Sequence, residues 1–257
     1  MNKTSAFIGR VIVAGALVVI SGVVQPAAAQ TPGPWIGRVF FGIDGGAQVT
    51  SSPYTSQTTF TLHAESATLE AKSEGSLGPV FAARGGFRIW KSLAVGVGVT
   101  AFWSTDEVAV KASLPHPFFF NQPRSVSGTA SGLQHDETMV AVEASWMVPL
   151  SRRMDLTLFG GPAFFSLRQD MVTTVLFTET YPFDTATFTG VETASVSESA
   201  TGFTAGADVS FLFSKSIGLG GHLRFSRASA SPAPAGGQPT TVDVGGLQVG
   251  GGLRFRF

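Results

Sequence analysis

Hydrophobic and polar residues alternate with a period of two along most of the chain beyond residue 35, which is the pattern of β-strands with two unlike faces. The segment 243–257 is the clearest example. Its apolar residues share one face and include Leu253, Phe255 and Phe257. Arg254 and Arg256 lie on the other face, so the two faces are expected to meet different media.

Eight segments with this alternation are predicted as strands. They are 36–49, 77–90, 93–104, 138–149, 154–168, 201–213, 216–227 and 243–257. Their lengths suit tilted membrane strands, which need about 9 to 11 residues. Short turns are expected at Lys91, Arg152 and Lys215, and long loops at 50–76, 105–137, 169–200 and 228–242. This alternation of short and long connections predicts an all-β, eight-stranded antiparallel up-and-down transmembrane β-barrel.

The segment 154–168 fits this pattern least well, because both of its faces are apolar. Pro162 also lacks the backbone N–H that a strand in a closed barrel would donate to its neighbour. A β-bulge at Gly160 and Gly161 is predicted to reconcile the two halves of this strand.

Charged residues inside the predicted strands fall on the face opposite the apolar one. A Lys or Arg facing lipid costs about 2 to 4 kcal/mol at the bilayer midplane, so this face is expected to point inward. An eight-stranded barrel is just wide enough for its side chains to fill it. We therefore expect a polar network that closes the lumen, with a narrow channel as the alternative. Its members are Asp44, Arg84, Arg88, Glu143, Asp208, His222, Arg224, Arg254 and Arg256.

The first 29 residues are typical of a cleaved signal peptide. Lys3 and Arg10 precede an apolar run over 11–24, and three alanines at 27–29 offer a cleavage site. The run is closed by Pro26 and is shorter than the roughly 20 apolar residues of a membrane-spanning helix. The mature barrel domain is therefore expected at residues 30–257.

Composition agrees with strands and excludes several classes of protein. The chain has 31 Gly and 22 Phe, and only 13% of its residues are charged. The absence of cysteine excludes a lipidation anchor, a disulfide framework and a thiolate metal site. Without Lys3 and Arg10, 15 basic residues face 17 acidic ones, a net charge of −2. Nucleic acid is not an expected partner, because binding it needs a concentrated basic surface.

The chain resembles the eight-stranded outer-membrane β-barrels, a family that includes the transmembrane domain of outer-membrane protein A. The resemblance rests on the signal, the loop asymmetry and the ending 251–257. It implies a place in outer-membrane lipid, with periplasmic termini and extracellular long loops. It also implies that Leu253, Phe255 and Phe257 form the insertion signal read by the barrel-assembly machinery. No peptidoglycan-binding domain is expected, so that role of some relatives does not carry over.

The sequence contains no convincing catalytic or metal-binding motif. His135, Asp136 and Glu137 could meet a divalent cation, but three adjacent residues lack the spacing of a preformed site. His222 and Ser226 share one face of a strand at a separation of about 13 Å, too far for direct proton transfer. We expect no enzyme and no cofactor. A lipid or peptide hydrolase remains the alternative, together with a secreted carrier that would hold its apolar face inside.

The expected loop 105–137 contains a mostly apolar segment, Leu114–Phe120. Exposed apolar patches often mark interaction sites. One hypothesis is that this segment is an extracellular tip that binds a partner. The alternative is that it folds over the mouth of the barrel, because clustered Phe side chains are usually covered.

Overall fold

The computed structural model describes residues 38–233 and 238–257, and this part of the chain contains ten β-strands. They are β1 (Val39–Gln48), β2 (Tyr54–Leu62), β3 (Glu65–Ser73), β4 (Gly78–Trp90), β5 (Leu93–Leu114), β6 (Arg124–Pro149), β7 (Met154–Glu179), β8 (Ala186–Leu212), β9 (Ile217–Ala230) and β10 (Val242–Arg256). Within these ranges, no helix is long and apolar enough to cross a membrane. The signal peptide expected at residues 1–29 lies outside the described residues.

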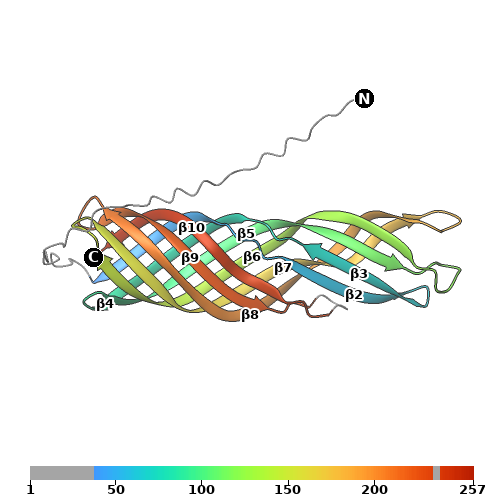
Figure 1. Ribbon diagram of the computed structural model, residues 1–257, viewed down its shortest axis with the longest axis horizontal. Helices are drawn as coiled ribbons and strands as arrows, with labels where there is room; N and C mark the ends of the chain where they lie inside the picture. Colours follow the sequence, from blue (N-terminus) through green and yellow to red (C-terminus); the bar gives the residue numbers. More distant parts are fainter. Residues whose placement is uncertain (1–37, 234–237) are drawn as a thin grey trace, which may run out of the picture. The chain divides into compact units, whose positions relative to one another are not determined.

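Eight of the strands, β1 and β4 to β10, close into an antiparallel ring (Figure 1). The first and last members pair along their length, from Phe40 opposite Arg256 to Gln48 opposite Gln248. Val39 and Phe257 exchange backbone hydrogen bonds of 3.0 and 2.9 Å at the end of this pairing. The predicted eight-stranded antiparallel barrel is confirmed.

The predicted long loops are wrong over most of their length, because strands continue through them. β5 and β6 extend into 105–137, and β7 and β8 extend into 169–200. The expected loop 50–76 contains the hairpin β2–β3, and β9 and β10 also run slightly into 228–242. The alternation of apolar and polar residues persists in these segments, but the apolar residues change faces. A search for apolar residues on one fixed face therefore ends too early.

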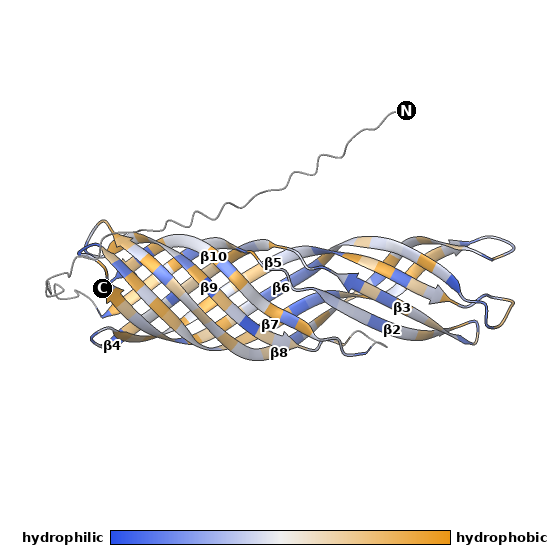
Figure 2. Cartoon of the chain, in the orientation of Figure 1, coloured by the Kyte–Doolittle hydropathy of each residue, from blue (hydrophilic) through white to orange (hydrophobic). Residues whose placement is uncertain are grey.

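Strand β5 shows this exchange of faces most clearly. Its even-numbered residues face the interior from one end to the other. Val97 and Trp103, which are odd-numbered, point outward and are exposed. Beyond them, the apolar residues Val108, Val110 and Leu114 are even-numbered and buried. The strand thus keeps its orientation, while its apolar side moves from the outside of the barrel to the inside. Figure 2 shows hydrophobic and hydrophilic residues alternating along the strands in both parts.

Beyond the barrel, the extended strands form two packed sheets. β3 pairs with residues 108–113 of β5, which gives a four-stranded sheet in the order β2-β3-β5-β6. The pairing between β6 and β7 stops at His135 and Gln169, so the hairpin β7–β8 forms the second layer. We call β2, β3 and residues 104–136 and 168–200 the outer extension.

An apolar core fills the space between the two layers of the outer extension. Its buried members are Ala67, Leu69, Ala71, Val108, Val110, Ala112, Leu114, Val126, Ala130, Leu133, Val172 and Val175. The partly buried Phe60, Phe177 and Phe188 pack against them. The outer extension is therefore a small β-sandwich with its own core. The barrel below it has a second buried apolar cluster, which includes Met139, Phe165 and Leu167, and buried charged side chains.

Strand β7 keeps one register with both neighbours through Gly160 and Gly161, so the predicted bulge there is wrong. Its pairing with β6 is interrupted between Ala163 and Gly160 without a change of register. Pro162, which has no N–H to donate, lies in that interruption. Strand β7 therefore accommodates Pro162 by losing backbone hydrogen bonds to β6, and no extra residue is inserted.

Candidate functional site

The interior of the barrel holds a network of carboxylates and guanidinium groups, centred on Asp208 of β8. Its carboxylate accepts hydrogen bonds from Arg254 of β10, including one of 3.1 Å from Nε. It also lies 3.2 Å from Nη2 of Arg84 on β4. Arg254 reaches Asp44 of β1 at 2.7 Å, and Asp44 is 3.4 Å from Nδ1 of His222. All five side chains are buried.

A second buried pair lies beside this group. Nη2 of Arg224 on β9 donates to Glu143 of β6 at 3.1 Å, and its Nη1 donates to the hydroxyl of Thr100 on β5. The ring of Phe159 lies 5.2 Å from the Arg224 guanidinium and 4.6 Å from that of Arg84. Cations over aromatic faces are stabilised, and more so when desolvated. Phe159 thus connects the two groups of charges.

Near the short-turn end, Arg256 of β10 donates to Asp155 of β7 and, at 2.9 Å, to the hydroxyl of Ser210 on β8. Arg88 lies half-buried on β4 opposite Ala94, towards the same end. Four carboxylates and four arginines therefore occur as buried ion pairs across the interior. Buried ions are tolerated when paired and hydrogen-bonded, and removing one partner costs about 3 to 5 kcal/mol.

Glycines leave the space that these long side chains need. A Cβ at Gly220 would lie 2.7 Å from Nε of Arg254. A Cβ at Gly98 would lie 2.6 Å from Oε1 of Glu143. Gly220 therefore leaves room for Arg254, and Gly98 leaves room for Glu143.

A second polar network joins three strands where the barrel meets the outer extension. Nε2 of His135 lies 2.7 Å from Oε1 of Glu137, and Nδ1 is hydrogen-bonded to the amide oxygen of Gln169 on β7. Oε2 of Glu137 accepts the backbone N–H of Gly245 on β10 at 2.8 Å. Because both ring nitrogens face oxygen acceptors, the arrangement suits a protonated imidazolium.

The electrostatic environment of the junction also favours the protonated form of His135. Burial of the imidazole opposes its charge, but the hydrogen bond and the negative charge of Glu137 outweigh burial and raise the pKa of His135. Asp106 of β5 adds to the increase. The junction therefore binds a proton more tightly than a free histidine would.

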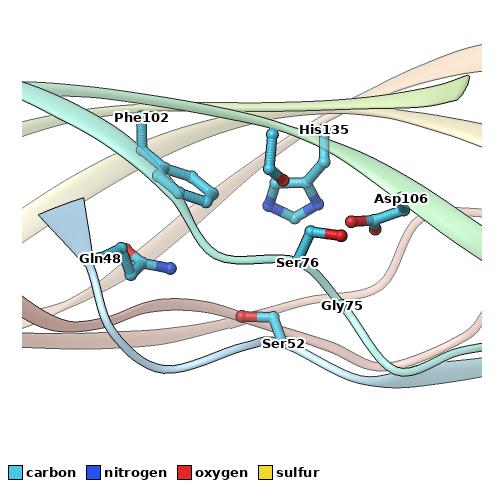
Figure 3. A pocket seen from close by; sticks show the side chains of 8 residues that line it. Gln48, Ser52, Gly75, Ser76, Phe102, Asp106 and His135 are labelled. Atoms are coloured by element: carbon cyan, nitrogen blue, oxygen red, sulfur yellow. The ribbon is translucent and has the colours of Figure 1, made fainter. Parts of the chain in front are cut away.

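A small, partly open recess, too narrow to hold a water molecule, lies beside this junction (Figure 3). It is lined by Gln48, Ser52, Gly75, Ser76, Phe102, Ser104, Asp106 and His135. Asp106 is buried here and accepts a hydrogen bond of 3.3 Å from the hydroxyl of Ser73. In the part of the chain that is described, no group of three or more His, Cys, Asp or Glu side chains could hold a metal ion. The cation site considered for residues 135–137 thus gains no support, because His135 and Glu137 bind each other.

The outside of the barrel is apolar. Leu253 and Phe257 are exposed, while Arg254 and Arg256, which lie between them in the sequence, are buried. Exposed aromatic and aliphatic residues continue on every strand of the ring, for example Phe41, Phe81, Val97, Val142, Leu158, Val209, Leu223 and Val249. A closed ring that is charged inside and apolar outside is the reverse of a water-soluble barrel.

Its structural neighbours are outer-membrane β-barrels. The outer membrane protein OprG from Pseudomonas aeruginosa is 9% identical, with a TM-score of 0.44, over 86% of this chain and 97% of that one. Neisserial surface protein A is 11% identical, with a TM-score of 0.39, over 85% and 97%. The outer membrane protease OmpT from Escherichia coli is 8% identical, with a TM-score of 0.46, over 88% and 98%. No family model and no curated protein matches the sequence.

Several members of the two networks were missed by reasoning from the sequence. Asp155 and Phe159 lie on the strand whose register was unsettled, and both have the inward parity of that strand. Fixing the register would have identified them. His135, Glu137 and Gln169 were assigned to loops, so no parity was considered for them. The continuing alternation of strands β6 and β7 was the signal that could have placed them inside.

Proposed function

We propose that this chain is an integral outer-membrane β-barrel whose barrel lies in lipid and carries the outer extension into the surrounding water. The proposal rests on the exchange of faces along β5. The outward residues from Val97 to Trp103 are apolar, whereas Glu107 and Lys111, on the same face, are charged. An outer surface that turns from apolar to charged at an aromatic residue is what a membrane boundary requires.

The thickness of the apolar band supports this placement. On β5 it runs from Leu93 to Trp103, and a tilted membrane strand needs about 9 to 11 residues. Aromatic girdles are expected at both borders of such a barrel. Exposed aromatic residues at the outer border are Phe81, Trp103, Phe164, Phe203 and Phe225, and at the short-turn border they are Phe87, Trp90, Trp146, Phe211, Phe213 and Phe257.

The proposed orientation has the short turns and Phe257 in the periplasm and the outer extension outside the cell. Barrels of this class have short periplasmic and long extracellular connections, which supports that direction. Outer-membrane lipid is then the main partner of the barrel. Leu253, Phe255 and Phe257, which share the outward face of β10, would be read by the barrel-assembly machinery during insertion.

The proposed role is structural and surface-directed, without a cofactor and without catalysis. The ion pairs of Asp44, Glu143 and Asp208 occupy the lumen, which favours a closed barrel over a narrow porin-like channel. Within the described residues, the hydroxyl of Ser226 has no hydrogen-bond partner, and His222 faces Asp44 instead. This arrangement gives no support to a hydrolase built on that serine.

The end of the outer extension is the proposed contact surface for an extracellular partner. Part of the segment 114–120 is buried and part is exposed, so neither of the two hypotheses, an inward-folded segment or an exposed tip, holds for all of it. Leu114 and His116 are buried, as expected of a segment that folds inward, while Phe118, Phe119 and Phe120 remain exposed. Three adjacent exposed Phe side chains at the end of a polar-walled projection support an interaction role.

Two measurements test this proposal. The chain has no cysteine, so a Gln122→Cys variant carries a single thiol beside the exposed Phe residues. We expect a membrane-impermeant maleimide to label it on intact cells, with outer-membrane fractions holding the protein. In planar bilayers, the purified protein is expected to give no steady discrete openings. Labelling only after cell lysis would contradict the orientation, and steady openings would contradict the closed lumen.

A further inference from the structure

The exposed aromatic residues at the far end of the outer extension come from two hairpins. Phe118, Phe119 and Phe120, in the turn between β5 and β6, are 68%, 55% and 70% exposed. Tyr181, in the turn between β7 and β8, is 86% exposed. Phe183, in the same turn as Tyr181, has its ring 5.5 Å from Phe118 and 6.1 Å from Tyr181. We call these five residues the aromatic tip.

A polar clamp beneath the aromatic tip holds the Phe residues outward. Nδ1 of the buried His116 accepts the backbone N–H groups of Phe118 and Phe119 at 3.1 and 3.2 Å. The backbone N–H of Asn121 donates to Glu65, in the β2–β3 hairpin, at 2.9 Å. These hydrogen bonds fix the shape of the turn and satisfy its backbone N–H groups. The Phe rings can therefore stay exposed without leaving these donors unpaired.

A buried arginine joins the two turns. Arg124 donates to the carbonyl oxygens of Pro115 and Phe183 at 2.9 Å each, and it pairs with Glu179. Phe183 has a φ of 72°, which a bulky side chain rarely adopts, so its turn depends on such contacts. The aromatic tip is thus one prearranged surface instead of two independent loops.

The position of the aromatic tip excludes its own membrane as the ligand. From Trp103, at the proposed membrane border, β5 continues for eleven residues to Leu114. At roughly 3.3 Å per residue, this is about 35 Å along the strand, beyond the headgroup region of the same bilayer. Figure 1 shows the β5–β6 and β7–β8 turns at the end of the outer extension remote from the C-terminus. The aromatic tip therefore points away from its own membrane, and a ligand would have to approach it from outside.

The charges around the aromatic tip indicate which kind of ligand surface it can approach. The turn segments 115–123 and 180–185 contain no Lys or Arg, and their one carboxylate, Asp184, is exposed. Glu179 and Glu65 lie close by, while the cation Arg124 is buried. An acidic surround is repelled by anionic headgroups, whereas a zwitterionic surface carries no such penalty.

We infer that the aromatic tip inserts into an opposing zwitterionic lipid bilayer, as presented by phosphatidylcholine. Its rings form a convex apolar surface and line no groove among the described residues, so they need a partner that accepts such a surface. The interfacial region of a bilayer does this, and aromatic side chains favour that region. This inference rests on the proposed outward orientation of the outer extension and adds the class of ligand.

Vesicle flotation tests the inference with the full chain reconstituted in nanodiscs. Vesicles of pure phosphatidylcholine are expected to carry the wild type upward, and vesicles of pure phosphatidylglycerol to carry much less. The triple variant Phe118→Ala, Phe119→Ala and Phe120→Ala is expected to lose at least about tenfold in binding, given the apolar area removed. His63→Ala, at the exposed turn of the neighbouring β2–β3 hairpin, is the matched control and is expected to bind like the wild type.

A second readout separates insertion from a general loss of folding. A polarity-sensitive dye on Gln122→Cys, with all three Phe residues intact, is expected to shift to the blue when phosphatidylcholine vesicles are added. Absence of flotation, equal flotation of the triple variant, or binding only to phosphatidylglycerol would each overturn the inference, the last by indicating an anionic ligand. A protein ligand is indicated if the triple variant lowers adhesion to cells while vesicles never bind, and this also overturns it. Surface labelling on intact cells tests the orientation separately, so the two proposals can fail independently.

Discussion

Asp208 and Arg254 form a hydrogen-bonded ion pair across the barrel interior, although they are 46 residues apart in the sequence. Both side chains are almost completely buried. The same carboxylate also faces Arg84, and the same guanidinium also reaches Asp44. This pair is therefore the point at which strands β1, β4, β8 and β10 are connected through side chains.

Removing one partner of this pair should destabilise the barrel. Asp208→Asn leaves Arg254 and Arg84 without their shared carboxylate, and a broken buried pair costs about 3 to 5 kcal/mol. Urea unfolding in lipid vesicles, followed by gel mobility, would measure the loss. Asp243→Asn is the matched control, because its pair with Arg227 has side chains 48% and 58% exposed and is worth at most about 1 kcal/mol. Equal losses in both variants would show that the interior network is not what stabilises the fold.

The junction at His135 should make stability depend on pH in a defined direction. Its pKa is raised in the folded protein, so its contribution is complete below the unfolded value of about 6.5 and disappears as the pH rises through the folded value. The difference in unfolding midpoint between the wild type and His135→Asn is therefore expected to be largest at low pH. Glu137→Gln should remove most of this pH dependence. A difference that grows towards high pH would contradict the charged junction.

The seam between β1 and β10 should be sensitive to a single methyl group. A Cβ at Gly252 would lie 1.8 Å from the backbone oxygen of Ile43, so Gly252→Ala must move the strands apart. Overpacking of this kind costs about 1 to 3 kcal/mol or more. Gly45→Ala, on the same seam with no atom within 4 Å of its added Cβ, is the control. Heat-dependent gel mobility would compare the variants, and equal behaviour would argue against the observed strand pairing.

The membrane boundary can be located with one substitution made at two heights on β5. Val99 and Ala109 are both exposed and both point outward. Val99→Arg is expected to cost about 2 to 4 kcal/mol, because it places a charge on the lipid face near the midplane. Ala109→Arg should change stability by no more than about 0.5 kcal/mol, since that position lies in water. Unfolding in vesicles measures both. Similar costs at the two positions would remove the basis for a boundary at Trp103.

The sequence predicts the barrel well because its signal is strictly local. A change of one residue in register would move Arg254 or Asp208 onto the lipid face, so the burial of charges fixes the register of each strand that carries one. The eight strands of the ring are confirmed, and the charged residues Asp44, Arg84, Glu143, Asp208, Arg224, Arg254 and Arg256 are buried. The outcome for 154–168 shows the limit, since two apolar faces give no such constraint.

The outer extension could not be predicted in the same way. Its strands alternate like those below, but Val108 and Val110 are buried in a core between two sheets, whereas Val97 faces outward. The membrane boundary proposed above lies at Trp103, and beyond it the same apolar residue type belongs on the opposite face. Which pairs meet, such as His135 with Gln169 or Arg124 with Glu179, depends on how the hairpins pack, and no local pattern encodes that packing.

The hydrogen bonds between Val39 and Phe257 belong to the β1–β10 seam, which must form before the barrel is closed. Ring closure joins segments about 200 residues apart, as the contact between Gln48 and Gln248 illustrates. Until β10 has been synthesised and delivered, β1 has one partner and an edge of unpaired backbone groups that hydrocarbon cannot satisfy. The fifteen residues of β10 therefore determine when the ring can close and its edge backbone groups can enter hydrocarbon with their partners in place.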